Sequence, residues 1–160
     1  MSGLLTAGDL ALERFDAAAG AYRRALEEAP AEALGYRRSG EDYTVGGLTH
    51  HVNAVLRHYG ATAEAMLAAG LGETAAPDSS SLFESANARA ARAPSRPERD
   101  AALAETAELH AAVRRLLAGA AAGDWERAAP VRFGPGDPYP TRLADVLGWL
   151  TDHYAEHTAQ

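Results

Sequence analysis

The sequence predicts an all-α protein built as a four-helix bundle, and three observations support this. Alanine, the strongest helix former, supplies 38 of the 160 residues. Valine occurs only 6 times and isoleucine is absent, so the β-branched residues that favour sheets are scarce. Larger apolar residues recur at spacings of three and four in four long segments, which is the pattern of amphipathic helices.

Length and charge limit the class of protein. A chain of 160 residues predicts a single domain over 1–160. The net charge of −7 and the lack of a basic block argue against binding to nucleic acid. No segment is apolar enough to span a membrane, and the first residues lack a signal-peptide pattern, so we expect a cytoplasmic protein. The absence of cysteine excludes disulfides and a cysteine nucleophile.

The first helix is expected over residues 7–28. Its apolar side includes Leu12, Phe15 and Tyr22, and Thr6 stands where an N-cap is expected. Residues 31–43 are rich in glycine and therefore predict a connection without helix or strand.

The second helix is expected over residues 45–68, with Thr44 as its N-cap. A loop at 70–81 follows, then a short helical piece at 82–91 and a break at 94–97. The apolar face of the second helix contains Leu48, Val52, Val55, Tyr59 and Met66.

The third helix is expected over 97–117, and a long irregular crossover over 119–140. Thr141 is predicted to cap the last helix. Along that helix, one stripe includes Leu143, Val146, Leu150, His153 and His157. Since two histidines continue an inward stripe, the bundle is expected to hold a site inside it.

His153 and His157 are four residues apart, which places their side chains one above the other on a helix. Such a pair can bind one metal ion, or it can be buried and satisfied by hydrogen bonds. His51, early in the second helix, is the best candidate for a third ligand. His50 points about 100° away and is expected to be exposed.

Four further side chains are expected to line a cavity or to belong to the core: His58, Tyr59, His110 and Trp149. Four arginines could bind an anionic thiol cofactor, although a genome bias toward arginine explains them equally well: Arg89, Arg92, Arg96 and Arg99.

Two segments resemble a known family. Residues 43–59, which begin Tyr-Thr-Val-Gly-Gly-Leu-Thr-His-His, resemble the start of the second helix in the DinB/YfiT-like family, and residues 143–160 resemble its last helix. The resemblance implies a four-helix bundle with a divalent metal held by His51, His153 and His157.

The resemblance also implies a class of activity. Characterised relatives include thiol S-transferases and thiol-dependent isomerases that use bacillithiol, mycothiol or glutathione. We therefore expect Zn²⁺ or Ni²⁺ as the cofactor and a small-molecule substrate, with a low-molecular-weight thiol as co-substrate. A metal-dependent hydrolase and a non-catalytic metal- or ligand-binding stress-response protein are the alternatives. Alanine-rich helix faces also suit a homodimer.

Overall fold

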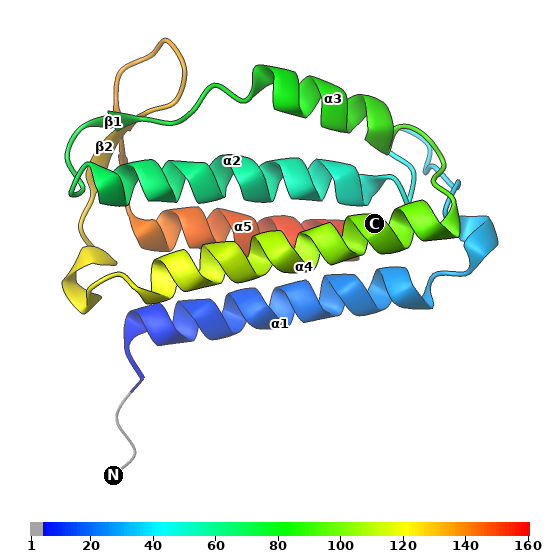
Figure 1. The fold of residues 1–160 in the computed structure, drawn as a ribbon, viewed down its shortest axis with the longest axis horizontal. Coiled ribbons are helices and arrows are strands. Elements are labelled where there is room, and N and C mark those ends of the chain that lie inside the picture. Colours follow the sequence, from blue (N-terminus) through cyan, green and yellow to red (C-terminus); the bar gives the residue numbers. More distant parts are fainter. Residues whose placement is uncertain (1–4) are drawn as a thin grey trace.

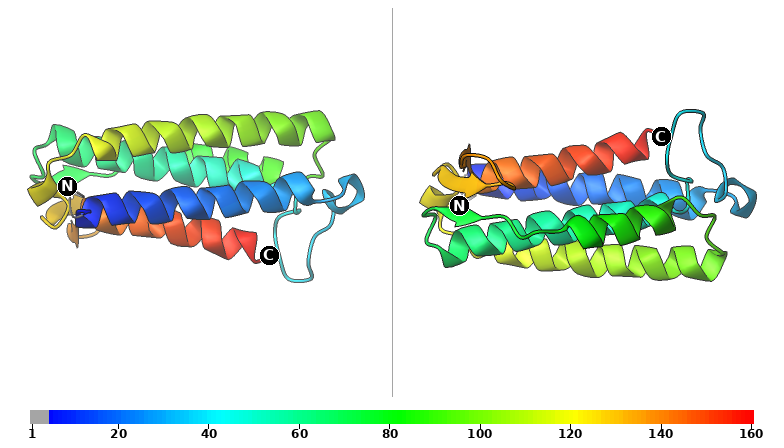
Figure 2. Two further views of the ribbon diagram at one scale, coloured as in Figure 1. Left: turned by 90° about the horizontal axis from the view of Figure 1, so that it is seen from below. Right: turned by 90° about the horizontal axis from the view of Figure 1, so that it is seen from above.

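The computed structural model describes residues 5–160, in which four long helices lie side by side as a bundle (Figure 1). The all-α prediction is confirmed. α1 and α5 run in one direction, and α2 and α4 run in the opposite direction (Figure 1). A shorter helix, α3, packs on the outside of α2 (Figure 2). The bounds are α1 (Ala7–Glu28), α2 (Leu48–Ala68), α3 (Ser80–Ala90), α4 (Arg96–Ala118) and α5 (Leu143–Thr158).

Each long helix packs against two others, and their apolar stripes meet in one core. α1 contacts α5 and α4, while α2 contacts α4 and α5. The core therefore sits along the axis of the bundle. Its largest fully buried side chains include Phe15, Tyr22, Leu56, Met66, Leu117, Leu147, Leu150 and Tyr154.

Two helices begin at capping boxes, and the first of them confirms the predicted N-cap at Thr6. The Thr6 hydroxyl accepts a hydrogen bond from the Asp9 N–H at 3.1 Å, and the Asp9 carboxylate accepts one from the Thr6 N–H at 2.9 Å. Ser95 and Glu98 repeat this arrangement at the start of α4. Because each box satisfies two N–H groups that the helix itself leaves free, it marks the first turn sharply.

α2 begins three residues later than predicted. Thr44 caps a turn that precedes the helix, since its hydroxyl accepts a hydrogen bond from the Gly47 N–H at 2.9 Å. The same hydroxyl donates to the Arg92 carbonyl at 2.8 Å, which ties the turn to the segment after α3. Gly47 is the N-cap of the helix. Tertiary contacts thus move the helix boundary away from the first capping residue.

The crossover before α5 is not irregular throughout, which corrects the prediction for 119–140. It contains β2 (Ala129–Arg132) and β3 (Tyr139–Thr141), which pair antiparallel. β1 (Thr74–Ala75) adds to β2 in parallel and completes a three-stranded sheet in the order β1-β2-β3. Short 3₁₀ turns occupy Ala31–Ala33 and Ala122–Asp124.

The predicted cap of the last helix is also corrected. Thr141 is the last residue of β3, and Arg142 is the N-cap of α5. The Arg142 N–H donates to the Asp145 carboxylate at 2.8 Å, and its guanidinium binds the same carboxylate. A basic residue therefore takes the place of the expected threonine.

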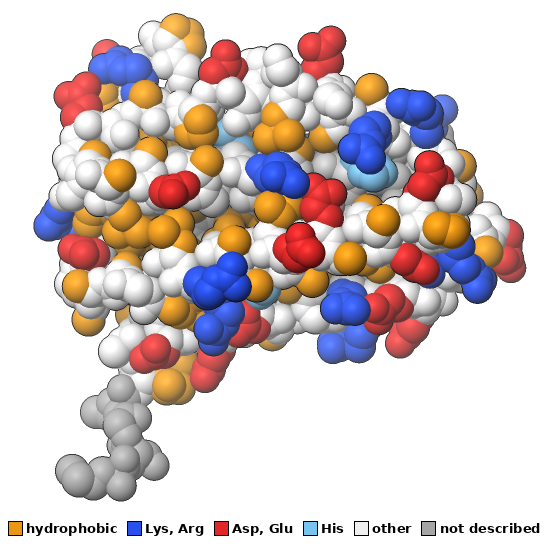
Figure 3. Space-filling model, viewed as in Figure 1, with side chains coloured by type: hydrophobic (Ala, Val, Ile, Leu, Met, Phe, Trp, Pro, Cys, Tyr) orange, Lys and Arg blue, Asp and Glu red, His pale blue; other side chains and the backbone are white. Residues whose placement is uncertain are grey.

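The two ends of the bundle differ. The sheet covers one end, whereas the opposite end combines the start of α2, the end of α5 and the connection 29–47 (Figures 1 and 2). Among residues 5–160, no helix is both long and apolar enough to cross a bilayer. The face shown in Figure 3 carries arginine and acidic side chains interspersed.

Candidate metal centre

Three histidines meet at the end of the bundle that carries the connection 29–47. His51 comes from the first turn of α2, while His153 and His157 come from the last turns of α5. One ring nitrogen from each lies within 4.8 Å of the other two. The ring centroid of His51 is 5.1 Å from that of His153 and 5.5 Å from that of His157. Three imidazoles at this spacing can hold one divalent cation.

Two of the rings are oriented by amide side chains. The Nδ1–H of His51 donates to Asn87 Oδ1 at 2.9 Å, and the Nδ1–H of His157 donates to Gln160 Oε1 at 2.7 Å. A neutral imidazole that donates from Nδ1 carries its lone pair on Nε2. Asn87 and Gln160 therefore select the tautomer that leaves Nε2 free for a metal, as outer hydrogen bonds do in known metal sites.

Two of the other ring nitrogens are buried without hydrogen-bond partners among the described residues. Neither His153 Nε2 nor His157 Nε2 has a hydrogen-bond partner among the described residues. Buried polar atoms in folded proteins are nearly always paired, so two unpaired acceptors side by side require an explanation. An ion between the three rings would satisfy both of them. The donor set thus fits a divalent metal.

The surroundings favour the neutral form of two of the rings, those of His51 and His153. Burial, which is the largest cause, and the neighbouring His157 and His51 together lower the pKa of His153 to about 3, because the charged ring would be desolvated and would be repelled by a second positive charge. Burial likewise lowers the pKa of His51, against a smaller opposite effect of its bond to Asn87. Neutral imidazoles are the form that binds a cation, so this pair of residues is ready to bind at neutral pH.

Comparison with known proteins shows the family to which the chain belongs. The family model described as the DinB superfamily matches residues 14–160. The chain belongs to the DinB superfamily. The resemblance noted for residues 43–59 and 143–160 is thereby confirmed. No curated protein and no solved structure matches the chain. The three-histidine site itself is therefore the basis for inferring the activity of this DinB protein.

Two aromatic rings lie next to His51. Tyr43 stacks on His51 with ring centroids 4.8 Å apart, and Phe83 of α3 lies 6.3 Å from the same ring. The histidines themselves are partly exposed or only just buried, with His157 at 9% exposure.

Three of the side chains predicted to line a cavity lie farther along the bundle, toward the sheet. His58 contacts Ser79 through Nδ1 at 2.8 Å and lines a pocket of about 560 Å³ below the β2–β3 loop. Tyr59 packs against Trp149 with ring centroids 5.4 Å apart. Phe83 links the two regions, because it lies 5.6 Å from His58 as well as near His51.

The structure places the other two histidines of the DinB protein outside the cluster. His110 stacks on Phe15 at 4.0 Å and donates from Nε2 to Asp16 at 2.9 Å, so it joins α4 to α1. His50 points away from His51, as predicted, but it is half-buried rather than exposed, since it faces Arg89 and neighbouring residues.

The predicted arginine cluster does not form one site. Arg99 is buried and donates to the Leu26 carbonyl at 3.0 Å and to the Asp100 carboxylate at 2.8 Å, so its role is structural. Arg89 and Arg92 line a separate pocket beside His50.

Sequence reasoning missed the two amide residues. Gln160 follows His157 by three residues, a helical spacing that brings the two side chains together, so this contact had a sequence signal. Asn87 had no such sequence signal for its contact with His51, because α3 approaches α2 only through tertiary packing. Phe83 was missed for the same reason.

The metal-free DinB protein is expected to lose stability as the pH falls from 6.5 to about 3. Over this range, the unfolded chain protonates residue 153 at the ordinary histidine pKa of 6.5, whereas the folded chain does so only near 3. The unfolded state then binds more protons, so the free energy of unfolding decreases with falling pH. In His153→Gln, the decrease between pH 7 and 4.5 should be smaller.

Urea denaturation of metal-free wild type and His153→Gln at both pH values measures this difference. Equal losses of stability in the two proteins would show that His153 is not the group responsible.

Proposed function

We propose that this DinB protein is a metal-dependent transferase that activates a low-molecular-weight thiol for attack on an electrophile. His51, His153 and His157 would be the metal ligands. One observation chiefly supports this proposal. Two buried Nε2 atoms on α5 have no hydrogen-bond partner among residues 5–160, and they lie beside the ring of His51, whose bond to Asn87 leaves its own Nε2 free.

Three neutral ligands determine the chemistry. They add no negative charge, so a bound Zn²⁺ or Ni²⁺ would keep its full charge, leave a position open and lower the pKa of a thiol placed there. Asn87 and Gln160 hold the rings of His51 and His157 in the binding tautomer. The chain has no cysteine, so the thiol must come from a small molecule such as bacillithiol, mycothiol or glutathione.

The same arrangement supports hydrolysis less well. A hydrolase needs a carboxylate near the reacting water to accept its proton. Asp152 and Glu156, the acidic residues next to the α5 ligands in sequence, are both exposed on the outer face of that helix. A thiol, by contrast, can release its proton to solvent before it reacts.

The test is a transfer assay with protein loaded with Zn²⁺ or Ni²⁺. Each of the three thiols is mixed with 1-chloro-2,4-dinitrobenzene, and thioether formation is followed by absorbance. With one thiol, the loaded wild type should react at least about tenfold faster than metal-free protein or His153→Ala, which corresponds to about 1.4 kcal/mol in the barrier. Metal binding without faster transfer of any thiol would instead favour a non-catalytic metal-binding protein.

A further inference from the structure

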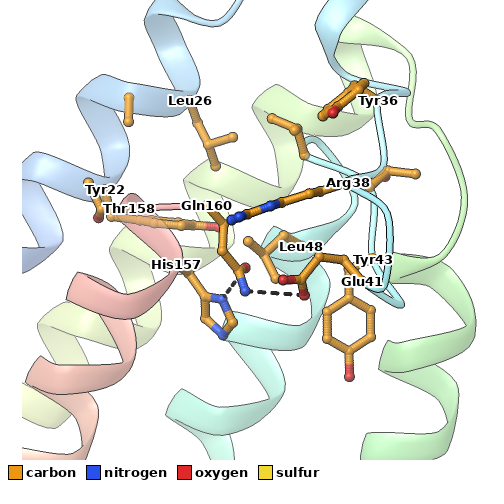
Figure 4. A pocket seen from close by; sticks show the side chains of 13 residues that line it. Tyr22, Leu26, Tyr36, Arg38, Glu41, Tyr43, Leu48, His157, Thr158 and Gln160 are labelled. Carbon is orange, nitrogen blue, oxygen red and sulfur yellow. Dashed lines mark hydrogen bonds between the residues drawn. The ribbon is translucent and has the colours of Figure 1, made fainter.

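A second pocket adjoins the three histidines at the open end of the bundle. Its volume is about 190 Å³, and it lies between the end of α1, the end of α5 and the connection 29–47 (Figure 4). His157 and Tyr43 both line it. Since Tyr43 also stacks on His51, the pocket shares one wall with the candidate metal centre.

Two opposite charges line this pocket. Arg38 reaches from the connection 29–47 across the pocket (Figure 4), and its guanidinium has no hydrogen-bond or ion-pair partner among residues 5–160. The Glu41 carboxylate accepts one long hydrogen bond, from Gln160 Nε2 at 3.3 Å. Arg38 and Glu41 do not pair with each other, so each remains available to a ligand.

The rest of the pocket is mostly apolar. Leu26 and Leu48 line it together with Tyr22 and Tyr36. A small ligand would therefore be held by two charged groups at separate points and by apolar contact between them. Guanidinium–carboxylate and ammonium–carboxylate bonds are the strong pairings available to these two side chains.

We propose that this pocket binds the zwitterionic part of a small thiol, with Arg38 binding its carboxylate and Glu41 its ammonium group. This proposal rests on the proposed function and narrows the co-substrate to thiols of the amino-acid type. Glu41 also contacts Gln160, which orients His157, so Glu41 and the centre share one hydrogen-bonded chain.

Calorimetric titration of zinc-loaded protein with three thiols tests the assignment. L-cysteine carries both charges, N-acetyl-L-cysteine lacks the ammonium group, and cysteamine lacks the carboxylate. Arg38→Gln should weaken binding of L-cysteine and N-acetyl-L-cysteine roughly tenfold and leave cysteamine unchanged. Glu41→Gln should weaken L-cysteine and cysteamine by a similar factor and leave N-acetyl-L-cysteine unchanged. Arg37→Gln, an exposed neighbour, is the matched control.

A further titration separates this proposal from the proposed function. S-methyl-L-cysteine has no free thiol, so its binding to the pocket does not depend on a metal ion. It can therefore be titrated into metal-free protein. It should bind wild type and Arg37→Gln equally, and both pocket variants more weakly. If zinc fails to bind, the proposed function falls while this titration still reports on the pocket. If the pocket variants bind all four probes as wild type does, or if no probe binds wild type, the pocket assignment is wrong.

Discussion

Replacing any one of His51, His153 or His157 by alanine is expected to reduce bound zinc from about one ion per chain to nearly none. The three ring nitrogens lie within 4.8 Å of one another, so each removal leaves two ligands and an open coordination sphere. Elemental analysis of the purified variants after loading with Zn²⁺ measures the effect.

His50→Ala and His110→Ala are the matched controls, because these histidines face other parts of the structure. Both should keep the wild-type zinc content. Asn87→Ala and Gln160→Ala should still bind zinc, but roughly 10- to 100-fold more weakly, as is typical when an outer hydrogen bond to a ligand is lost. Equal loss of zinc in His50→Ala, or none in His153→Ala, would contradict the assignment of the three ligands.

Gly47→Ala is expected to lower the free energy of unfolding by about 3 kcal/mol, near the upper range for overpacking. A Cβ at this position would meet backbone oxygens at the end of α3, among them the Arg92 carbonyl at 2.7 Å. Backbone atoms cannot swing aside as the tip of a side chain can. The start of α2 or the end of α3 must therefore move. Urea denaturation measures the change.

Gly148→Ala is the control, because a Cβ there meets nothing within 4 Å. It lies inside α5, where alanine favours the helix over glycine by about 0.5–1 kcal/mol, so this variant should be slightly more stable than wild type. If Gly47→Ala unfolds at the same urea concentration as wild type, the close approach of α3 does not constrain the fold.

The long helices were predictable because their signals are local. Periodic apolar residues and the cap at Thr6 depend only on neighbours in sequence, and the observed bounds of α1 and α4 agree with the predicted ones to within one residue. The sheet was not predictable. β1 has two residues, and its partner β2 lies more than fifty residues away and contains Pro130, so its pairing depends on the finished bundle.

The candidate site likewise contains residues with a local signal in the sequence and residues that only tertiary packing brings to it. Helical spacing singled out His153 and His157 as a possible ligand pair. The position of His51 early in the second helix made it the best candidate for a third ligand, and the family resemblance implied the same residue. Asn87, which orients His51, lies on a helix that the sequence did not connect with the site. The carboxylate of Glu41 and the guanidinium of Arg38 were missed because the connection 29–47 has no periodic pattern that would place its side chains.

The proposed ligands come from α2 and α5, and about a hundred residues of chain separate His51 from His153. An ion held between them would act as a reversible cross-link across most of the sequence. The unfolded chain does not present the three rings together, so the ion would bind the folded chain far more tightly than the unfolded one. Folding and metal loading would then be coupled equilibria, so the midpoint of thermal unfolding would depend on the concentration of free metal.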